Sequence, residues 1–212
     1  MNQQPKIVVF GATGKVGTHF VEQALNAGYQ VRAFVRNRAK LSQAVSDKIE
    51  VLEGDALNSG DVERAIADVD VVVSCLGGTG KRPIMYMAYN NIMTATAKQS
   101  HPPRCIMISS IGLGGTSWLI KFTLTLIAGK EAIADFEKAD KRIREETAVP
   151  FVLVRPYALT DKPGNGRYRA TKKQNATFMR PIPRADVATF MVDAVADNQW
   201  DGKLGVQLGG AK

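Results

Sequence analysis

The sequence predicts an α/β fold in which one doubly wound parallel sheet is covered by helices on both faces. Two observations lead to this prediction. Short apolar runs rich in β-formers recur along the 212 residues, and segments with helical spacing lie between them. No internal repeat, low-complexity segment or linker divides the chain, and its length is ample for one domain but marginal for two. We therefore expect a single domain over residues 1–212.

Six short apolar runs are the expected strands. They are IVVF from Ile7, VRAFV from Val31, IEVLEG from Ile49, VDVVVSCL from Val69, CIMISS from Cys105 and FVLVRP from Phe151. Parallel strands that are buried on both faces read as nearly continuous apolar runs of this kind. A final strand is expected over residues 203–209.

A helix is expected directly after the first strand. Its inward face is formed by residues at helical spacing, namely Phe20, Val21, Ala24 and Leu25. Gly28 then ends the segment, as glycine commonly does after the last turn of a helix.

Further helices fill the other gaps between strands. One begins with Ser59 as its expected N-cap, and its inward face holds Val62, Ala65 and Ile66. The remaining helices are expected over residues 83–100, 130–147 and 184–197. This alternation of strand and helix is what places helices on both faces of a parallel sheet.

A glycine triplet, Gly11, Gly14 and Gly17, follows the first strand and opens the first helix. In this setting Gly11 allows a tight turn, Gly14 lets the backbone approach a pyrophosphate, and Gly17 lets the helix pack close to the strand. The helix then points its free N–H groups at the phosphates. A merely tight strand–helix turn is the alternative, but the position within a βαβ unit favours a Rossmann-like, dinucleotide-binding domain.

The end of the second expected strand carries positive charge. Enzymes that prefer NAD usually place an acidic residue there, whereas this chain has Arg36, with Arg38 and Lys40 just beyond. A guanidinium can bind a 2′-phosphate with two hydrogen bonds and can stack on adenine. The alternative is a solvated basic loop. The pattern favours NADP(H) over NAD(H).

Two further strand ends supply candidate cofactor contacts. Asp55, followed by Ala56, comes after the third strand and could accept a hydrogen bond from the adenine amino group. An Asx turn or a helix cap is an equally good interpretation of Asp55, and both can hold. After the fourth strand, Gly77 and Gly78 would let the backbone pass close to a ribose, or would form an ordinary glycine turn.

Composition limits the other possibilities. The formal net charge is +8 and the sequence pI is about 9.6, which indicates an anionic partner such as nucleic acid, an acidic membrane surface or a phosphorylated small molecule. Cys75 and Cys105 border apolar runs and are interpreted as buried thiols. His19 and His101 are far apart and are interpreted as structural, so no metal site is expected.

Nothing in the sequence predicts a membrane span. The apolar stretch 118–129 has only 12 residues and includes Lys121, so a buried helix or a mobile flap is favoured. The N-terminus has no signal-peptide pattern, and a cytoplasmic location is expected.

A basic segment follows the sixth strand. Residues 162–184 contain no acidic residue and hold Lys162, Arg167, Arg169, Lys172, Lys173, Arg180 and Arg184. It should lie near the carboxyl edge of the sheet, where it could form a lid over an anionic substrate; a solvated basic hairpin is the alternative. Arg167 and Arg169 would share a face and are the candidate substrate-binding residues. Nucleic acid is disfavoured, since no binding motif accompanies the charge and aromatic residues are sparse.

Several motifs together resemble a known family. The motifs are GATGKVG, VRNRAKL, EGDALN, ISSIG and VRPYALTD. In order and position they are similar to the atypical short-chain dehydrogenases with an NmrA-like NAD(P)-binding domain, and within that family to the small members of the flavin reductase/biliverdin-IXβ reductase type. The resemblance covers nearly the whole chain, and none of its motifs specifies a substrate.

The resemblance implies a role for each matching position. The pyrophosphate would be held by Gly11, Thr13, Gly14, Lys15 and Val16. The 2′-phosphate would be held by Arg36, and the ribose would be flanked by Leu76 and Gly77. The nicotinamide would lie beside Ser109 and Ser110, in a pocket lined by Pro156, Tyr157 and Ala158.

The chain departs from the family in one respect. Typical short-chain dehydrogenases carry a Tyr-x-x-x-Lys pair on the helix after the fifth strand, but residues 130–147 contain no tyrosine. Phe136 cannot transfer a proton, and Lys138 without a tyrosine would be only a surface lysine. A carbinol dehydrogenase or sugar epimerase of the usual type is therefore not expected.

Hydride transfer to a flavin, quinone or tetrapyrrole asks less of the protein, which must orient the reactants and exclude water. The proton could come from solvent or from Ser110, which we favour over Ser109 because strand alternation sends only one of them toward the pocket. Either serine could instead satisfy backbone groups at the strand end. Tyr157 could stack on a planar substrate or supply a proton, or it could be a core aromatic.

The leading hypothesis from the sequence is an NADP(H)-dependent oxidoreductase that reduces a planar, anionic small-molecule acceptor. The alternative is a non-catalytic NADP(H) sensor that acts through a protein partner, for which the apolar segment 112–130 could supply a surface. An assembly factor that keeps the domain as a scaffold is a third, less favoured possibility. The fold alone does not separate them.

Overall fold

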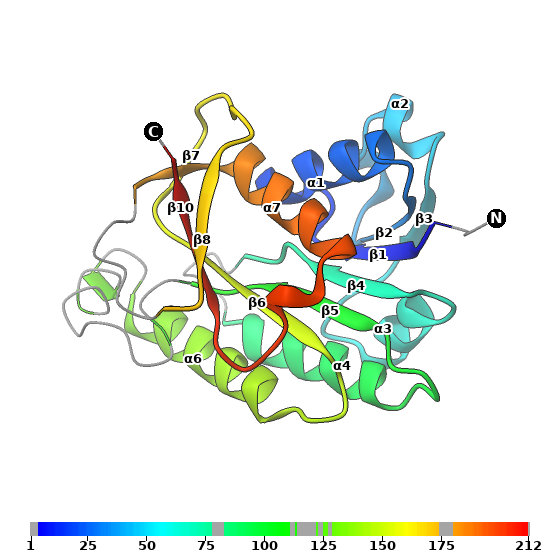
Figure 1. The fold of residues 1–212 in the computed structure, drawn as a ribbon. Coiled ribbons are helices and arrows are strands. Elements are labelled where there is room, and N and C mark those ends of the chain that lie inside the picture. Colours follow the sequence, from blue (N-terminus) through cyan, green and yellow to red (C-terminus); the bar gives the residue numbers. More distant parts are fainter. Residues whose placement is uncertain are drawn as a thin grey trace.

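Eight strands form the central sheet, in the order β3-β2-β1-β4-β5-β6-β10-β8 (Figure 1). The computed structural model describes residues 4–77, 83–110, 113, 122, 125–126, 129–173 and 180–211. The strands in chain order are β1 Lys6–Phe10, β2 Gln30–Val35, β3 Glu50–Glu53, β4 Val71–Ser74, β5 Arg104–Ile108, β6 Phe151–Pro156, β8 Tyr168–Thr171 and β10 Val206–Gly210. All pairings are parallel except that of β8 with β10.

The doubly wound parallel sheet predicted from the sequence is confirmed. The chain builds the sheet outward from β1 to β2 and β3, and then returns to the other side of β1 with β4, β5 and β6. Ligands of such sheets bind at the carboxyl ends of the strands where this order reverses. The sequence did not predict β8 or the small parallel pair β7 (Leu159–Thr160) and β9 (Ile182–Pro183).

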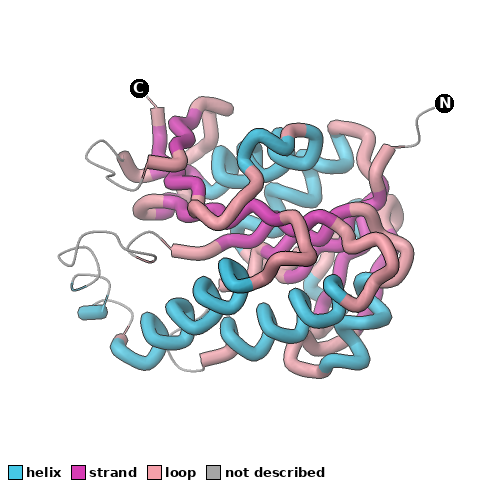
Figure 2. Tube along the Cα trace, turned by 60° about the horizontal axis from the view of Figure 1, so that its bottom comes forward, coloured by secondary structure: helices cyan, strands magenta, loops and turns pink. Residues whose placement is uncertain are grey.

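Helices cover both faces of the sheet (Figures 1 and 2). The longer ones are α1 Lys15–Asn26 and α7 Arg184–Ala196 on one face, and α3 Ser59–Ile66, α4 Met85–Ala97 and α6 Lys130–Glu145 on the other. Strand alternation creates this division. Ile7 and Val9 of β1 pack with α1 and α7, whereas Val8 and Phe10 pack with α3, α4 and α6.

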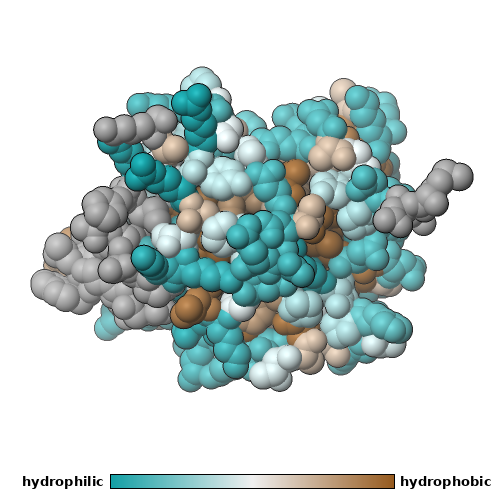
Figure 3. All heavy atoms as spheres, viewed as in Figure 1, coloured by the Kyte–Doolittle hydropathy of each residue, from teal (hydrophilic) through white to brown (hydrophobic). Residues whose placement is uncertain are grey.

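The remaining helical elements are short: α2 Gln43–Ser46 and two 3₁₀ turns, η1 Arg38–Lys40 and η2 Asn198–Trp200. On the face seen in Figure 3, hydrophilic residues predominate and hydrophobic ones form only small groups. Within the described ranges, no helix is long and apolar enough to cross a membrane. Those ranges also contain no group of three side chains suited to binding a metal ion.

One predicted cap was wrong. The N-cap of α3 is Asn58 rather than Ser59, because the Asn58 Oδ1 atom accepts hydrogen bonds from the N–H groups of Gly60 (2.9 Å) and Asp61 (3.1 Å). Ser59 is instead the first helical residue. The predicted inward face of this helix, with Val62, Ala65 and Ile66 buried, is confirmed.

Two helices, α4 and α6, are shorter than predicted. At one boundary of each, an acidic side chain accepts hydrogen bonds from backbone N–H groups. Helix α4 begins at Met85, and the buried Asp135 of α6 accepts from the N–H groups of Met85 (2.7 Å) and Tyr86 (3.2 Å). Helix α6 ends at Glu145, because Glu146 is extended and its carboxylate accepts from the next two backbone N–H groups.

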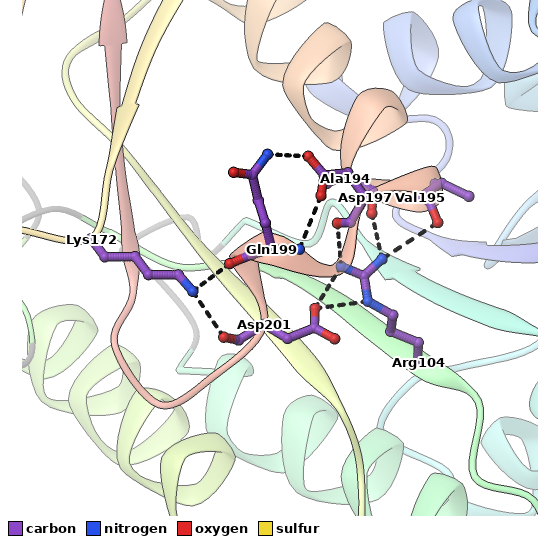
Figure 4. A network of polar contacts seen from close by, with 7 residues as sticks. All are labelled: Arg104, Lys172, Ala194, Val195, Asp197, Gln199 and Asp201. Atoms are coloured by element: carbon purple, nitrogen blue, oxygen red, sulfur yellow. Dashed lines mark hydrogen bonds and ion pairs between the residues drawn. The ribbon is translucent and has the colours of Figure 1, made fainter.

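Arg104 connects the start of β5 to the end of α7 (Figure 4). Its guanidinium donates to the carbonyl oxygens of Ala194 and of Asp197 (2.9 Å), and to the carboxylate of Asp201 at 2.8 and 2.5 Å. Helix α7 has no basic residue in its last turn, so Arg104 supplies the donors that its final carbonyl groups need.

Replacement of Arg104 by alanine is therefore expected to lower the free energy of unfolding by about 2–3 kcal/mol, because hydrogen bonds to a charged group are lost and carbonyl groups remain partly buried. Urea unfolding followed by circular dichroism measures the change. Lys98→Ala is a matched control: Lys98 also forms an ion pair, with Glu63, but its side chain is 63% exposed, so a change below about 1 kcal/mol is expected. Equal changes in the two variants would contradict this account of Arg104.

Candidate cofactor and active site

A cavity of about 360 Å³ lies at the carboxyl ends of β1 to β4, where the strand order reverses. Its size falls within the range of small-molecule sites. The predicted cofactor residues that line it are Gly11, Thr13, Gly14, Arg36, Lys40, Asp55, Ala56, Leu76 and Gly77. Apolar walls come from Phe10, Phe34, Ile84 and Ala88. The structure thus gathers residues from four separate strand ends at one site.

The glycine loop has the geometry that the sequence predicted. Gly11 has a φ of +77°, and its carbonyl accepts from the N–H of Gly14 at 2.9 Å, which closes a tight turn. A Cβ atom on Gly11 would lie 2.9 Å from the carbonyl carbon of Cys75. A Cβ atom on Gly17 would overlap the carbonyl oxygen of Gly11. The tight turn and the close packing of helix against strand are therefore confirmed.

The start of α1 suits a bound phosphate. The helix begins at Lys15 with Gly14 as its N-cap, so no side chain at that position accepts from the first-turn N–H groups. Such N–H groups, together with the helix dipole, form an anion site. Val16 is buried in the core, so only its backbone N–H is suited to a phosphate contact. The cavity and these donors fit the adenosine and pyrophosphate of a dinucleotide.

The basic residues after β2 are not equivalent. Arg36 and Lys40 line the main cavity, and they also line an adjoining cavity of about 300 Å³ together with Thr13 and Asn37. Arg38 lines neither cavity. The structure therefore places two of the three predicted cations together, beside the glycine loop.

Asp55 forms the Asx turn that the sequence suggested. Its Oδ1 atom accepts from the N–H of Leu57 at 3.0 Å, and its own N–H donates to Asp61 at 2.9 Å. That hydrogen bond is the main cause of the lowered pKa of Asp61. Asp55 also lines the cavity, so its contact to adenine stays a prediction.

Lys15 is held by a side chain from another part of the chain. Its Nζ atom lies 2.7 Å from a carboxylate oxygen of Asp161, and the other oxygen of Asp161 is 2.5 Å from Arg184. The hydrogen bond from Lys15, supported by the charge of Arg184, lowers the pKa of Asp161. These contacts join the start of α1 to the segment after β7 and to the start of α7. Lys15 itself does not line the cavity.

The predicted nicotinamide residues lie at the ends of β5 and β6. The two serines differ in burial: Ser109 is 6% exposed and donates from Oγ to Asp140 at 2.9 Å, whereas Ser110 is half-buried. Pro156 is buried and Tyr157 is half-buried, and the N–H of Tyr157 donates to Leu208 at 2.8 Å.

Ala158, the third member of that predicted pocket, is exposed, and its carbonyl accepts from Ile182 at 2.9 Å. None of the predicted nicotinamide residues lines either described cavity. Their roles stay predictions, and the neighbouring residues 111, 112 and 114–121 lie outside the described ranges.

A buried ionic network beneath these strand ends was not predicted. The Asp140 carboxylate of α6 accepts from Arg155 of β6 at 2.9 Å on both oxygens, and from Arg144 at 2.7 Å. Asp140 and Arg155 are each only 1% exposed. Gly205 leaves room for the arginine, because a Cβ atom there would lie 2.5 Å from its Nε atom. One feature of the sequence could have indicated this network. Asp140 lies beside Ala139 on the inward face of α6, where an acidic side chain needs a buried partner.

Three buried groups, Tyr89, Cys75 and Cys105, hold their protons. Tyr89 of α4 is buried and donates to the carbonyl of Ile108, and burial raises its pKa. Cys75 lines the cavity, but burial raises its pKa to about 12. Cys105 is likewise buried with a pKa of about 12, so the prediction of two buried thiols is confirmed. None of these groups is ionised near neutral pH.

The basic segment divides between two edges of the sheet. Strand β8 is antiparallel to β10, with Tyr168 opposite Gly210 and Arg169 opposite Gly209, so the exposed Arg167 and Arg169 lie near the carboxyl edge as predicted. Lys172 lies at the amino edge instead, where its Nζ atom donates to the carbonyl oxygens of Gln199 and Asp201 (Figure 4).

The expectation that the whole basic segment forms a lid over the site is therefore wrong for Lys172. Strand β8 carries the chain away from the carboxyl edge before this residue. Arg184 pairs with Asp161 at the start of α7. Residues 174–179 of the basic segment and most of the apolar segment 112–130 lie outside the described residues.

Comparison with known proteins adds three findings. An uncharacterised chloroplast protein of Arabidopsis thaliana is 27% identical over an alignment of 221 positions that covers 94% of this chain and 75% of that protein. A short-chain dehydrogenase/reductase of Veillonella parvula, solved in complex with NADP, has a TM-score of 0.81 at 18% identity, covering 97% of this chain and 94% of its own. ChuY, an anaerobillin reductase from Escherichia coli O157:H7, has a TM-score of 0.78 at 22% identity, with 98% of both chains covered.

These structural likenesses establish the fold. They do not bear on the cytoplasmic location expected from the sequence, which stays a prediction. A family model described as NAD(P)H-binding matches residues 11–198, which includes the glycine loop, the strand ends around the cavity and α7. The chain therefore belongs to this NAD(P)H-binding family.

Proposed function

We propose that the protein is an NADPH-dependent reductase that transfers a hydride to a planar, anionic small molecule such as a flavin, quinone or tetrapyrrole. The observation that carries this proposal is the cavity where the strand order reverses. There the glycine loop and the start of α1 offer N–H groups that can donate hydrogen bonds to a phosphate. Arg36 and Lys40 line both this cavity and the adjoining cavity of about 300 Å³.

The preference for NADPH rests on charge. The end of β2 carries Arg36 where an acidic residue would select NAD, and Lys40 lines the same adjoining cavity. A 2′-phosphate there would be bound by a guanidinium and an ammonium group. The Veillonella parvula structure was solved with NADP, which supports this reading.

The proposed reaction needs little acid–base catalysis from the side chains of the protein. The bound nicotinamide supplies the hydride, and the acceptor takes up a proton as it is reduced. Helix α6 carries Phe136 and the exposed Lys138 but no tyrosine, which argues against the Tyr-x-x-x-Lys mechanism of typical short-chain dehydrogenases. Ser110, half-buried at the end of β5, is the residue that we propose as proton donor or relay.

The acceptor is proposed to be anionic because Arg167 and Arg169 lie exposed near the carboxyl edge of the sheet. Neither makes an ion pair with any residue that the structure describes. The description of ChuY as an anaerobillin reductase supports a reductase reading.

The test is NADPH oxidation by the purified protein, followed at 340 nm with flavins, quinones and a tetrapyrrole as acceptors, with NADH in parallel. Turnover of one acceptor, faster with NADPH, is the expected result. Tight NADPH binding without turnover of any acceptor would instead support the non-catalytic sensor, which the absence of a tyrosine on α6 also favours. The search would then turn to a protein partner.

Arg36→Ala is expected to weaken NADPH binding by about tenfold to a hundredfold, since it removes charge-assisted hydrogen bonds to the 2′-phosphate. NADH binding should change less than about twofold. Isothermal titration calorimetry measures both dissociation constants. Arg38→Ala is the matched control, because Arg38 lies two residues away but lines neither cavity. Equal losses of NADPH and NADH affinity in Arg36→Ala would refute the 2′-phosphate assignment.

A further inference from the structure

The turn that carries Arg36 and Lys40 is tied to the neighbouring strand by a carboxylate. Glu53, the last residue of β3, accepts a hydrogen bond through Oε1 from the backbone N–H of Arg38 at 2.6 Å. Strands β2 and β3 lie side by side in Figure 1, and Glu53 is the register partner of Val35, which directly precedes Arg36. The carboxylate therefore spans from one strand end to the turn that leaves the next.

The other hydrogen bonds of this turn are internal to it. The side chain of Asn37 accepts from the N–H of Ala39 at 2.9 Å, and the carbonyl of Arg38 accepts from the N–H of Leu41 at 3.0 Å. These bonds shape η1 but do not fix where it lies relative to the sheet. Among the residues with described positions, Glu53 makes the one hydrogen bond that joins η1 to a neighbouring strand.

The position of this acid distinguishes it from an NAD-selecting residue. Such a residue stands at the end of β2 and accepts from the ribose hydroxyl groups. Glu53 stands one strand further out, lines neither cavity, and directs its carboxylate at a backbone amide. A carboxylate beside a turn with three cationic side chains is electrostatically favourable in the free protein, but its charge would oppose the binding of a 2′-phosphate there. A favourable effect of Glu53 on phosphate binding must therefore come from its hydrogen bond and not from its charge.

We propose that Glu53 is a positioning residue that determines the preference for NADPH. By holding the Arg38 amide, it fixes η1 so that Arg36 and Lys40 line the adjoining cavity beside Thr13 before the cofactor arrives. This inference rests on the proposed NADPH preference. A turn that is already ordered loses less conformational entropy when it binds a phosphate, so affinity for the 2′-phosphate rises.

Two substitutions separate the hydrogen bond from the charge. Glu53→Gln removes the negative charge but keeps an Oε1 acceptor for the Arg38 amide. Glu53→Ala removes both. Because neither variant carries the charge, the difference between them reports on the side-chain acceptor and not on the charge. Glu53 is exposed, so both substitutions are compatible with the fold, and thermal unfolding of each variant checks this.

The experiment measures dissociation constants of NADPH and NADH for the full chain and both variants by isothermal titration calorimetry. We expect Glu53→Gln to bind NADPH about threefold to tenfold more tightly than Glu53→Ala, with NADH affinities that agree within about twofold. A merely structural role would change NADPH and NADH affinity in parallel. The ratio of the two is therefore the decisive readout.

Two results would overturn the role of Glu53 without affecting the proposed preference for NADPH. One is equal NADPH affinity in the two variants, and the other is a parallel change for NADPH and NADH. A third result has a different meaning: if the unsubstituted protein binds NADH as tightly as NADPH, the proposed cofactor preference fails first, and the role of Glu53 fails with it. The unsubstituted protein thus separates the two failures.

Discussion

Replacement of Asp140 by alanine is expected to lower the free energy of unfolding by about 3–5 kcal/mol. The Arg155 guanidinium would stay in the interior, 1% exposed, without the carboxylate that it contacts at 2.9 Å through both oxygens. Removing one partner of a buried ion pair is strongly destabilising, because the remaining charge loses its counter-ion in a medium of low dielectric constant. Urea unfolding at neutral pH, followed by circular dichroism, measures the effect.

Arg144 provides the control for this prediction. It contacts the same carboxylate at 2.7 Å, but its side chain is 36% exposed, and the Asp140 carboxylate keeps its contact with Arg155 after Arg144 is removed. Arg144→Ala should therefore cost less than about 1 kcal/mol. Combining Asp140→Ala with Arg155→Met should restore part of the lost stability, because the buried charge that lost its carboxylate is then also removed. If Asp140→Ala and Arg144→Ala proved equally mild, the buried pair would not be holding β6 to α6.

The same substitution has a consequence for the candidate site. The hydroxyl proton of Ser109 is directed at Asp140, which leaves the oxygen lone pairs of this serine as its remaining hydrogen-bonding capacity. In Asp140→Ala that proton becomes available at the end of β5. The buried acid therefore bears on both the stability of the domain and the hydrogen bonding of a residue predicted to lie beside the nicotinamide.

The sequence predicted best what depends on short-range pattern. The strand that begins near Ile7, the glycine turn at Gly11 and the inward face of α3 follow from periodicity and backbone sterics, and all three are confirmed. These features need only neighbouring residues. The order of the strands around the cavity was not predicted from the sequence and is an observation of the structure.

What escaped prediction depends on contacts between distant segments. Asp140 and Arg155 come from different elements, and only packing shows that they meet in the interior. Glu53 reads in the sequence as an ordinary strand-end acid, yet it binds the turn after β2. Strand β8 lies in a basic segment without clear alternation, so neither its existence nor its antiparallel direction could be foreseen, and Lys172 was misplaced as a result.

The glycine turn yields the second large effect. Gly17→Ala is expected to abolish measurable NADPH binding and to lower stability by about 2–3 kcal/mol, as overpacking of a tight contact does. The added Cβ would overlap the carbonyl oxygen of Gly11 and lie 2.9 Å from the Cα atom of Ala12, and both of these belong to the backbone. No rotamer change relieves such a contact. Helix α1 must move away from β1, and its N–H groups move with it.

Gly60→Ala serves as the matched control for Gly17→Ala. Gly60 also lies in the first turn of a helix, α3, but a Cβ atom there would meet only the side-chain oxygen of Asn58, at 3.4 Å. This substitution should leave NADPH binding unchanged and stability the same or slightly higher. Fluorescence titration with NADPH, together with thermal unfolding, measures both properties. NADPH binding by Gly17→Ala at the affinity of the unsubstituted protein would mean that the cofactor does not depend on the close approach of α1 to the loop, and the phosphate site proposed there would have to be placed elsewhere.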